Sequence, residues 1–248
     1  MRIFIDISYK GTSYHGWQIQ QNAHTVQKEL NAALSAILRT NVETVGSGRT
    51  DTGVHAIHQV AHLDVPEYPK NDFLYRINSL LPHDISINSW RKVHPDAHAR
   101  YSATSRTYEY RISKVKDPFL HDLVFFFDRP LNLQHMQEAC SILCRYNDFE
   151  CFSRSNSQVK HFNCIIHQAK WEEENNKIIF TIQANRFLRG MVRAIAGTML
   201  DIGMNKISLS DFENILLSKD RRKAGAALPP QGLFLTDVKY PDDIYISD

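Results

Sequence analysis

The chain has 248 residues, enough for one large domain or two small ones that each bury a core without disulfide or metal staples. Hydrophobic residues make up 43% and charged residues 23%, as in globular proteins and unlike disordered or fibrous chains. The formal net charge of +2 by itself says little about binding to a polyanion. No apolar run approaches the roughly 20 residues of a transmembrane helix, so we expect a protein that is neither secreted nor inserted in a membrane.

Four cysteines, at positions 140, 144, 151 and 164, include no Cys-x-x-Cys pair and no regular metal-ligand spacing. This pattern favours reduced thiols that pack in a cytoplasmic protein. No His-x-x-x-His pair with an interposed Glu occurs, and the glycine-containing segment 46–50 lacks the Lys-Ser/Thr ending of a phosphate-binding P-loop. We therefore expect no metal and no nucleotide cofactor.

The first half of the chain predicts a βαββαβ order. Alternation of Ile3, Ile5 and Ile7 predicts a strand over Arg2–Tyr9, and apolar residues at helical spacing predict a helix over Val26–Leu38 with Thr25 at its N-cap position. The remaining elements expected here are strands over 42–45 and 57–65, a helix from 71 to 80 capped by Asn71, and a strand over 85–93. This order is that of the ferredoxin-like arrangement.

The second half repeats this order. The expected elements are a strand over 106–112, a helix over 133–144, a hairpin of strands 163–171 and 178–183, helices over 187–202 and 209–217, and a final strand over 232–240. We therefore expect an α+β fold of two ferredoxin-like halves, residues 1–103 and 104–248. The halves would join into a mainly antiparallel sheet with helices on one face.

The loop 46–55 is the most unusual segment, with three glycines and a carboxylate, Asp51, close to the guanidinium of Arg49. One interpretation is turn chemistry, in which the aspartate bonds its own backbone two residues on. The other is a carboxylate that an adjacent arginine keeps ionised and that acts as a nucleophile or base.

Two further segments carry aromatic and cationic side chains. Tyr108 and Tyr110 fall on one face of the strand over 106–112, either as half-buried core residues or with one ring against a planar substrate. In the helix over 187–202, Arg186, Arg189 and Arg193 would form a stripe. Such a stripe is a solvated face, a phosphate track or the partner of a carboxylate.

Six segments, in order along the chain, resemble motifs of the TruA family of tRNA pseudouridine synthases. They are YKGTSYHGWQIQ (9–20), GRTDTGVHA (48–56), NSLLPHDI (78–85), AHARYSATSRTY (97–108), FLRGMVR (187–193) and PQGLFL (230–235). The resemblance implies the pseudouridine synthase fold, tRNA as the partner, a homodimer and no cofactor. It also implies isomerisation of uridine to pseudouridine in the anticodon stem-loop, at positions 38, 39 and 40.

Roles for single residues follow from the same resemblance. It makes Asp51 the nucleophile, Tyr108 the ring that packs on the target uracil, Arg193 the partner of the aspartate, Leu233 a pocket residue, and Arg49 the residue that helps to displace the base. Further RNA-binding residues would be His98, Arg100, Tyr101, Lys116, Ser155 and Arg189.

Two other classes remain as alternatives. Aspartic proteases also use Asp-Thr-Gly, although this chain has a single copy of it and Arg49 stands where a protease has an apolar strand. A non-catalytic RNA-binding module shares the βαββαβ order, but the aromatic RNP pattern of such modules is absent.

Overall fold

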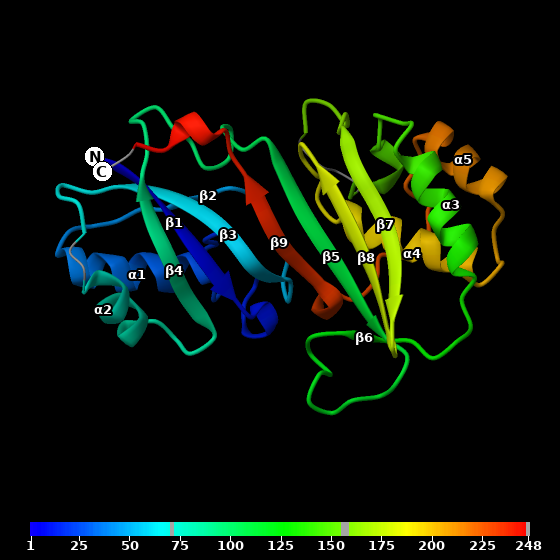
Figure 1. Cartoon of the computed structure of the whole chain (residues 1–248), viewed down its shortest axis with the longest axis horizontal. Coiled ribbons are helices and arrows are strands. Elements are labelled where there is room, and N and C mark those ends of the chain that lie inside the picture. The colour runs from blue at the N-terminus through cyan, green and yellow to red at the C-terminus, as the bar shows by residue number, and fades with distance from the viewer. Residues whose placement is uncertain (70–71, 155–158, 247–248) are drawn as a thin grey trace. The chain divides into compact units, whose positions relative to one another are not determined.

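The computed structural model describes residues 1–69, 72–154 and 159–246. It has mixed α and β structure with mainly antiparallel strands (Figure 1). The chain forms two compact units: unit 1 comprises Met1–Ser105 and Leu235–Asp248, and unit 2 comprises Arg106–Phe234. Each unit is described below on its own.

Unit 1 is a sheet with the strand order β4-β1-β3-β9, in which β1 pairs antiparallel with both β3 and β4, and β2 pairs with β3. Its elements are β1 (Arg2–Tyr9), α1 (Val26–Leu38), β2 (Val45–Gly46), β3 (His55–Asp64), α2 (Phe73–Leu80), β4 (Ile85–Lys92) and most of β9 (Leu233–Lys239). Short 3-10 turns lie at Gly11–Ser13 and Asp242–Ile244.

The alternation along β1 decides which face of this sheet is covered. Ile3, Ile5 and Ile7 are fully buried on one face. Helix α2 packs on that face, because Phe73 meets the ring of Trp90, which lies opposite Ile5 in β4, at 5.1 Å between centroids. Helix α1 contacts α2 and passes behind β1 and β4 in Figure 1. Asp6 and Ser8 therefore point to the opposite, helix-free face.

Two expectations for unit 1 need correction. The strand expected over 42–45 shrinks to β2, because side chains of α1 take its backbone donors: Val42 N bonds Ser35 Oγ at 3.0 Å, and Thr44 N bonds Asn31 Oδ1 at 3.1 Å. The expected helix start at Asn71 lies outside the described residues, and α2 begins at Phe73.

Unit 2 contributes the antiparallel strands β5-β8-β7, in that order, and the short β6 pairs parallel with β5. Its elements are β5 (Ser105–Ser113), β6 (Phe125–Phe126), α3 (Leu133–Leu143), the turn Glu150–Phe152, β7 (Ile166–Glu174), β8 (Lys177–Ala184), α4 (Met191–Gly203), α5 (Leu209–Ser218) and the turn Pro230–Gly232. Helix α4 is buried almost all round. Met199 of α4 accepts from Trp171 Nε1 at 3.3 Å, and the ring of Trp171 stacks on that of Phe180.

The helix expected from position 187 begins later, at Met191. Gly190 precedes it with φ of 73°, a left-handed conformation that ends the helical path. Arg186 and Arg189 therefore lie in the turn before α4, and only Arg193 is on the helix. The predicted arginine stripe along one helix face is wrong.

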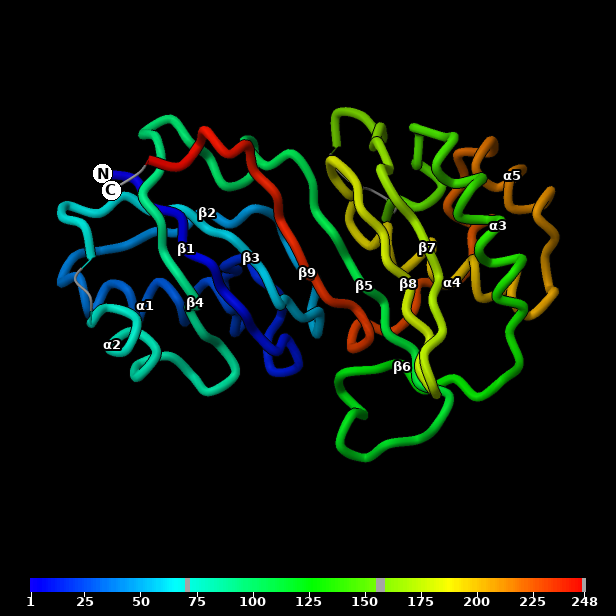
Figure 2. The backbone as a smooth tube through the Cα atoms, in the orientation of Figure 1, coloured from blue at the N-terminus to red at the C-terminus, as the bar shows by residue number. Residues whose placement is uncertain are grey.

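The end of the chain returns to unit 1, whereas the sequence-based boundary placed it with the second half. Lys239 O accepts from Thr104 N at 2.8 Å, Tyr240 donates its hydroxyl to Ala99 O at 2.6 Å, and Ile246 N bonds Lys92 O at 3.0 Å. Figure 2 shows the red segment after β9 turning back along the strands of unit 1. These contacts over more than a hundred residues leave no periodic signal in the sequence.

In the residues that the structure describes, we find no helix with the length and apolar character needed to cross a bilayer.

Candidate active site

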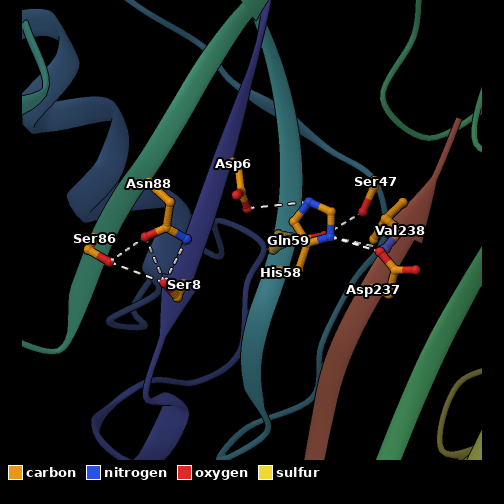
Figure 3. Close-up of polar contacts among 9 residues, drawn as sticks. All are labelled: Asp6, Ser8, Ser47, His58, Gln59, Ser86, Asn88, Asp237 and Val238. Carbon is orange, nitrogen blue, oxygen red and sulfur yellow. Dashed lines mark hydrogen bonds and ion pairs between the residues drawn. The ribbon is translucent and has the colours of Figure 1, made fainter. Parts of the chain in front are cut away.

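The loop 46–55 of unit 1 is anchored to strand β3. Ser47 N donates to Val60 O at 2.7 Å, and the side chain of Ser47 bonds Gln59, which is fully buried. The amide of Gln59 in turn donates to Gly48 O at 3.1 Å. Figure 3 shows Ser47 and Gln59 on their neighbouring segments. Hydrogen bonds to β3 therefore fix the N-terminal end of the loop.

The segment after β1 fixes the middle of the same loop. The hydroxyl groups of Tyr9 and Thr50 form a buried hydrogen bond of 2.8 Å. The backbone carbonyl of Thr50 accepts from Trp17 N at 3.3 Å. Gly53 N donates to Tyr14 O at 3.3 Å. The motif at 9–20 is thus explained physically, because its backbone and rings support the residues on both sides of Asp51.

Two glycines permit this close approach. A Cβ on Gly11 would stand 2.0 Å from Val54 O, and one on Gly16 would stand 2.4 Å from Thr50 O. Gly16 also has φ of 89°, which L side chains rarely adopt. In addition, His55 accepts a hydrogen bond from Gly11 N at its Nδ1 atom, at 3.0 Å. No other residue type fits the two glycine positions without moving the loop.

Asp51 is presented on this support. Its carbonyl accepts from Val54 N at 3.1 Å, which closes a backbone turn, and Gly53 adopts φ of 77° within that turn. The side chain of Asp51 is half-buried, its neighbour Thr50 is buried, and Arg49 is exposed. The arrangement offers a carboxylate on a hydrogen-bonded turn with an exposed cation two residues away, which suits nucleophilic or base chemistry.

In unit 2 the structure places the other predicted site residues on three elements. Tyr108 is half-buried on β5, with the ring of Phe187 edge-on at 5.2 Å between centroids. Leu233 is buried at the start of β9. Arg193 lies in the first turn of α4, where its Nε donates to Leu228 O at 2.6 Å and its backbone carbonyl accepts from Leu228 N at 3.1 Å.

The segment 225–228 packs closely against α4 and so orients Arg193. A Cβ on Gly197 would stand 1.9 Å from Ala226 O, and Gly225 N donates to Thr198 Oγ1 at 2.9 Å. These contacts hold the backbone that accepts from the guanidinium. An arginine held through Nε keeps its terminal nitrogens in a fixed fork, the geometry that suits a carboxylate or phosphate.

Tyr110 is a core residue, which is the first of the two interpretations of the strand over 106–112. It is fully buried, and its hydroxyl donates to Pro229 O at 2.8 Å. Burial raises the pKa of this phenol strongly, while the nearby Arg193 opposes the shift. Gly232 lies so close to its ring that a Cβ there would be 2.8 Å away. Tyr110 thus positions the 229–233 turn that leads to Leu233.

The structure describes five of the six further residues expected to bind RNA. His98, Arg100 and Tyr101 share one turn in unit 1. Lys116 is exposed in the segment after β5, and Arg189 is exposed in the turn before α4, where its carbonyl accepts from Arg154 N at 3.3 Å. Ser155 lies outside the described residues.

Sequence reasoning missed a polar cluster on the helix-free face of unit 1 (Figure 3). His58 on β3 lies between two carboxylates, with Nδ1 at 3.0 Å from Asp237 Oδ1 and Nε2 at 3.5 Å from Asp6 Oδ1. Burial raises the pKa of Asp6, and His58 opposes that shift. Asp237 is 179 positions from His58, so no local signal could have found the pair.

In the described ranges, no group of three or more His, Cys, Asp or Glu side chains is placed to hold a metal ion.

Known proteins are similar in sequence to this chain over nearly its whole length. A family model described as tRNA pseudouridine synthase matches residues 7–102 and 139–241. Proteins named tRNA pseudouridine synthase A from Parabacteroides distasonis and Bacteroides fragilis are each 46% identical over 247 residues, with 98% of both chains covered. The protein of that name from Porphyromonas gingivalis is 45% identical over 250 residues. These matches favour the synthase over the two alternatives raised by the sequence, an aspartic protease and a non-catalytic RNA-binding module. The chain belongs to the tRNA pseudouridine synthase family and is an isomerase of the TruA type.

Proposed function

We propose that this enzyme isomerises uridine to pseudouridine in the anticodon stem-loop of tRNA, at positions 38, 39 and 40, with Asp51 as its catalytic carboxylate. The observation that carries the proposal is the loop of Asp51. Buried hydrogen bonds and two glycine contacts fix it at both ends, as expected for a group that must meet a reacting atom accurately.

The chemistry needs no consumed reagent, because uridine and pseudouridine are isomers. The N-glycosidic bond of the target breaks, the uracil rotates, and a C-glycosidic bond forms at C5. C5 releases its proton and the freed N1 takes one up, so the atoms balance. The base must first leave the helical stack. In this proposal Asp51 acts on the detaching nucleoside, Arg49 helps to displace the base, and Tyr108 packs on the uracil. Arg193 is the charge partner of the carboxylate, and Leu233 lines the pocket.

Two architectural expectations belong to the same proposal. Each half derives from a ferredoxin-like arrangement; supporting this, β1 pairs with both β3 and β4 in unit 1, and β5-β8-β7 are antiparallel in unit 2. The active enzyme is a homodimer, which light scattering after size-exclusion chromatography would test.

The central test replaces Asp51 by Asn, which removes the anionic oxygen and keeps the side-chain shape. We expect release of tritium from C5-labelled uridine in tRNA to fall by at least about 10³-fold, because a lost nucleophile or base costs that much or more. Affinity for tRNA should stay within about twofold. The control is Asp243→Asn, an exposed aspartate of the same unit, which should keep full activity. Substantial release by the Asp51 variant would remove Asp51 from the mechanism.

A further inference from the structure

The segment 78–85, one of the six motifs that resemble the TruA family, has no role in the function proposed above. It joins α2 to β4, and β4 begins at the end of unit 1 where β1 ends (Figure 1). Asn78 in α2 ties the helix to the strand, because its Oδ1 accepts from Ile87 N at 2.8 Å and its Nδ2 donates to Ile87 O at 2.9 Å. The turn between α2 and β4 is therefore fixed relative to both elements.

Asp84 in this turn contacts the segment after β1 twice. Its backbone carbonyl accepts from Lys10 N at 2.9 Å, and its side chain accepts from the hydroxyl of Tyr14 at 2.5 Å. Tyr14 is 2% exposed and Asp84 is half-buried, so water competes little for this hydrogen bond. Burial raises the pKa of Tyr14, and Asp84 adds to that shift, so the phenol keeps the proton that it donates. Hydrogen bonds accepted by a carboxylate are stronger than those between neutral groups.

Tyr14 passes this restraint on to the loop of Asp51. Its backbone N donates to Gly11 O at 3.0 Å, and its carbonyl accepts from Gly53 N at 3.3 Å. Gly53 lies in the turn that presents Asp51, at φ of 77°. The backbone of Tyr14 is thus held at N and O, while its side chain is held by Asp84. A shift of the phenol therefore moves the carbonyl that Gly53 contacts.

We propose that Asp84 is a positioning residue for catalysis, which holds the turn of Asp51 in place through Tyr14. The inference rests on the proposed function in taking Asp51 as the catalytic carboxylate. It goes beyond that function because it adds a residue from another part of the chain, outside the loop of Asp51 and outside the segment after β1. Loss of the Asp84 carboxylate should slow the chemical step and leave the affinity for tRNA nearly unchanged.

The test measures single-turnover release of tritium from C5-labelled uridine in tRNA, the affinity for tRNA, and hydrogen exchange of residues 51–54. We expect Asp84→Ala and Tyr14→Phe each to lower the rate at saturating enzyme by about 10- to 100-fold, because misplacing a catalytic group by about 1 Å can cost that much. The dissociation constant of tRNA should stay within about twofold. Exchange of the Gly53 amide should accelerate, since its acceptor is then less well fixed.

Further variants separate positioning from a general loss of stability. Asp84→Asn keeps an oxygen that accepts from Tyr14, so it should restore the rate to within about threefold of the wild type. Tyr146→Phe is the matched control, because Tyr146 donates its hydroxyl to the carboxylate of Glu213 at 2.7 Å in unit 2. It loses the same kind of hydrogen bond and should keep the wild-type rate and exchange. The double variant Tyr14→Phe/Asp84→Ala should be no slower than the slower single variant, since both changes break one bond.

Unchanged rate and unchanged exchange in both Asp84→Ala and Tyr14→Phe would overturn the proposal. An equal rate loss in Tyr146→Phe would also overturn it, as would a double variant in which the two losses multiply. If Asp84→Ala does not fold, Tyr14→Phe and Asp84→Asn decide the question by the same measurements. Failure of the proposed function gives a different result: Asp51→Asn then keeps its activity, while exchange of residues 51–54 still responds to loss of the Asp84 carboxylate.

Discussion

His62 shows how one buried side chain makes stability depend on pH. Burial, reinforced by Arg2 and His98, lowers its pKa from an ordinary 6.5 to about 4. Between pH 6.5 and about pH 4, the His62 side chain is protonated in the unfolded chain but stays neutral in the folded chain. The free energy of unfolding is therefore highest above about pH 6.5 and falls as the pH drops toward 4. Protonation would also charge the ring that is packed against His98.

We expect His62 to account for at most about 3 kcal/mol of acid destabilisation, which is the pKa shift converted at about 1.4 kcal/mol per pH unit. Urea unfolding of the wild type and of His62→Gln between pH 4.5 and 7.5 checks this. Glutamine can still accept from Ala99 N, which donates to Nδ1 of His62 at 3.1 Å, but does not titrate. The variant should lose less stability on acidification than the wild type. An identical loss in both proteins would contradict the assignment.

Among the elements, the end of β1 and the segment that follows it support the candidate catalytic loop. Their effect on Asp51 is indirect, through Tyr9, Tyr14 and Trp17, which contact Thr50 and Gly53. Changes in this segment should therefore alter the chemical step more than the binding of tRNA. Gly48 lies in the same loop but makes no such close contact, because a Cβ there would meet nothing within 4 Å.

Gly16→Ala tests this role. The added Cβ would meet Thr50 O at 2.4 Å, and an alanine at φ of 89° is strained, so we expect a stability loss of about 2 to 4 kcal/mol. The rate of tritium release should fall at least about 100-fold, because the turn of Asp51 must shift. Gly48→Ala, in the same loop, should remain close to the wild type in both measurements. Comparable defects in the two variants would argue against a support that acts through close packing.

At the scale of the whole molecule, the chain is not two consecutive halves. Residues 235–248 complete unit 1, where Asp237 meets His58, Tyr240 meets Phe4 at 4.9 Å between ring centroids, and Arg91 covers the ring of Tyr245 at 4.0 Å. A unit that combines β1 to β4 with the much later β9 cannot finish folding until β9 has been synthesised.

Deleting residues 235–248 should therefore destabilise unit 1 selectively. We expect hydrogen exchange to accelerate in β1, β3 and β4, because the strand β9 and the ring contacts that shield them are lost. Protection of β7 and β8 in unit 2 should stay close to that of the intact chain. Exchange that accelerates equally in both units, or in neither, would contradict the assignment of the chain end to unit 1.

The sequence by itself determined the elements whose signal is local. Alternation of three isoleucines placed β1 at its observed bounds, and helical spacing placed α1 at its own, because both patterns report burial of a single face. The resemblance of six short motifs led to the tRNA pseudouridine synthase family, which the comparisons confirm.

Only the tertiary structure decided what depends on distant partners. Side chains of α1 reduced the strand expected over 42–45 to two residues, a left-handed Gly190 moved the start of α4, and β9 joined the first unit. The ring contact of His62 with His98 and the Asp6–His58–Asp237 cluster likewise join residues far apart in the chain. Such contacts depend on how strands are ordered in a sheet, and no periodicity along the chain encodes that order.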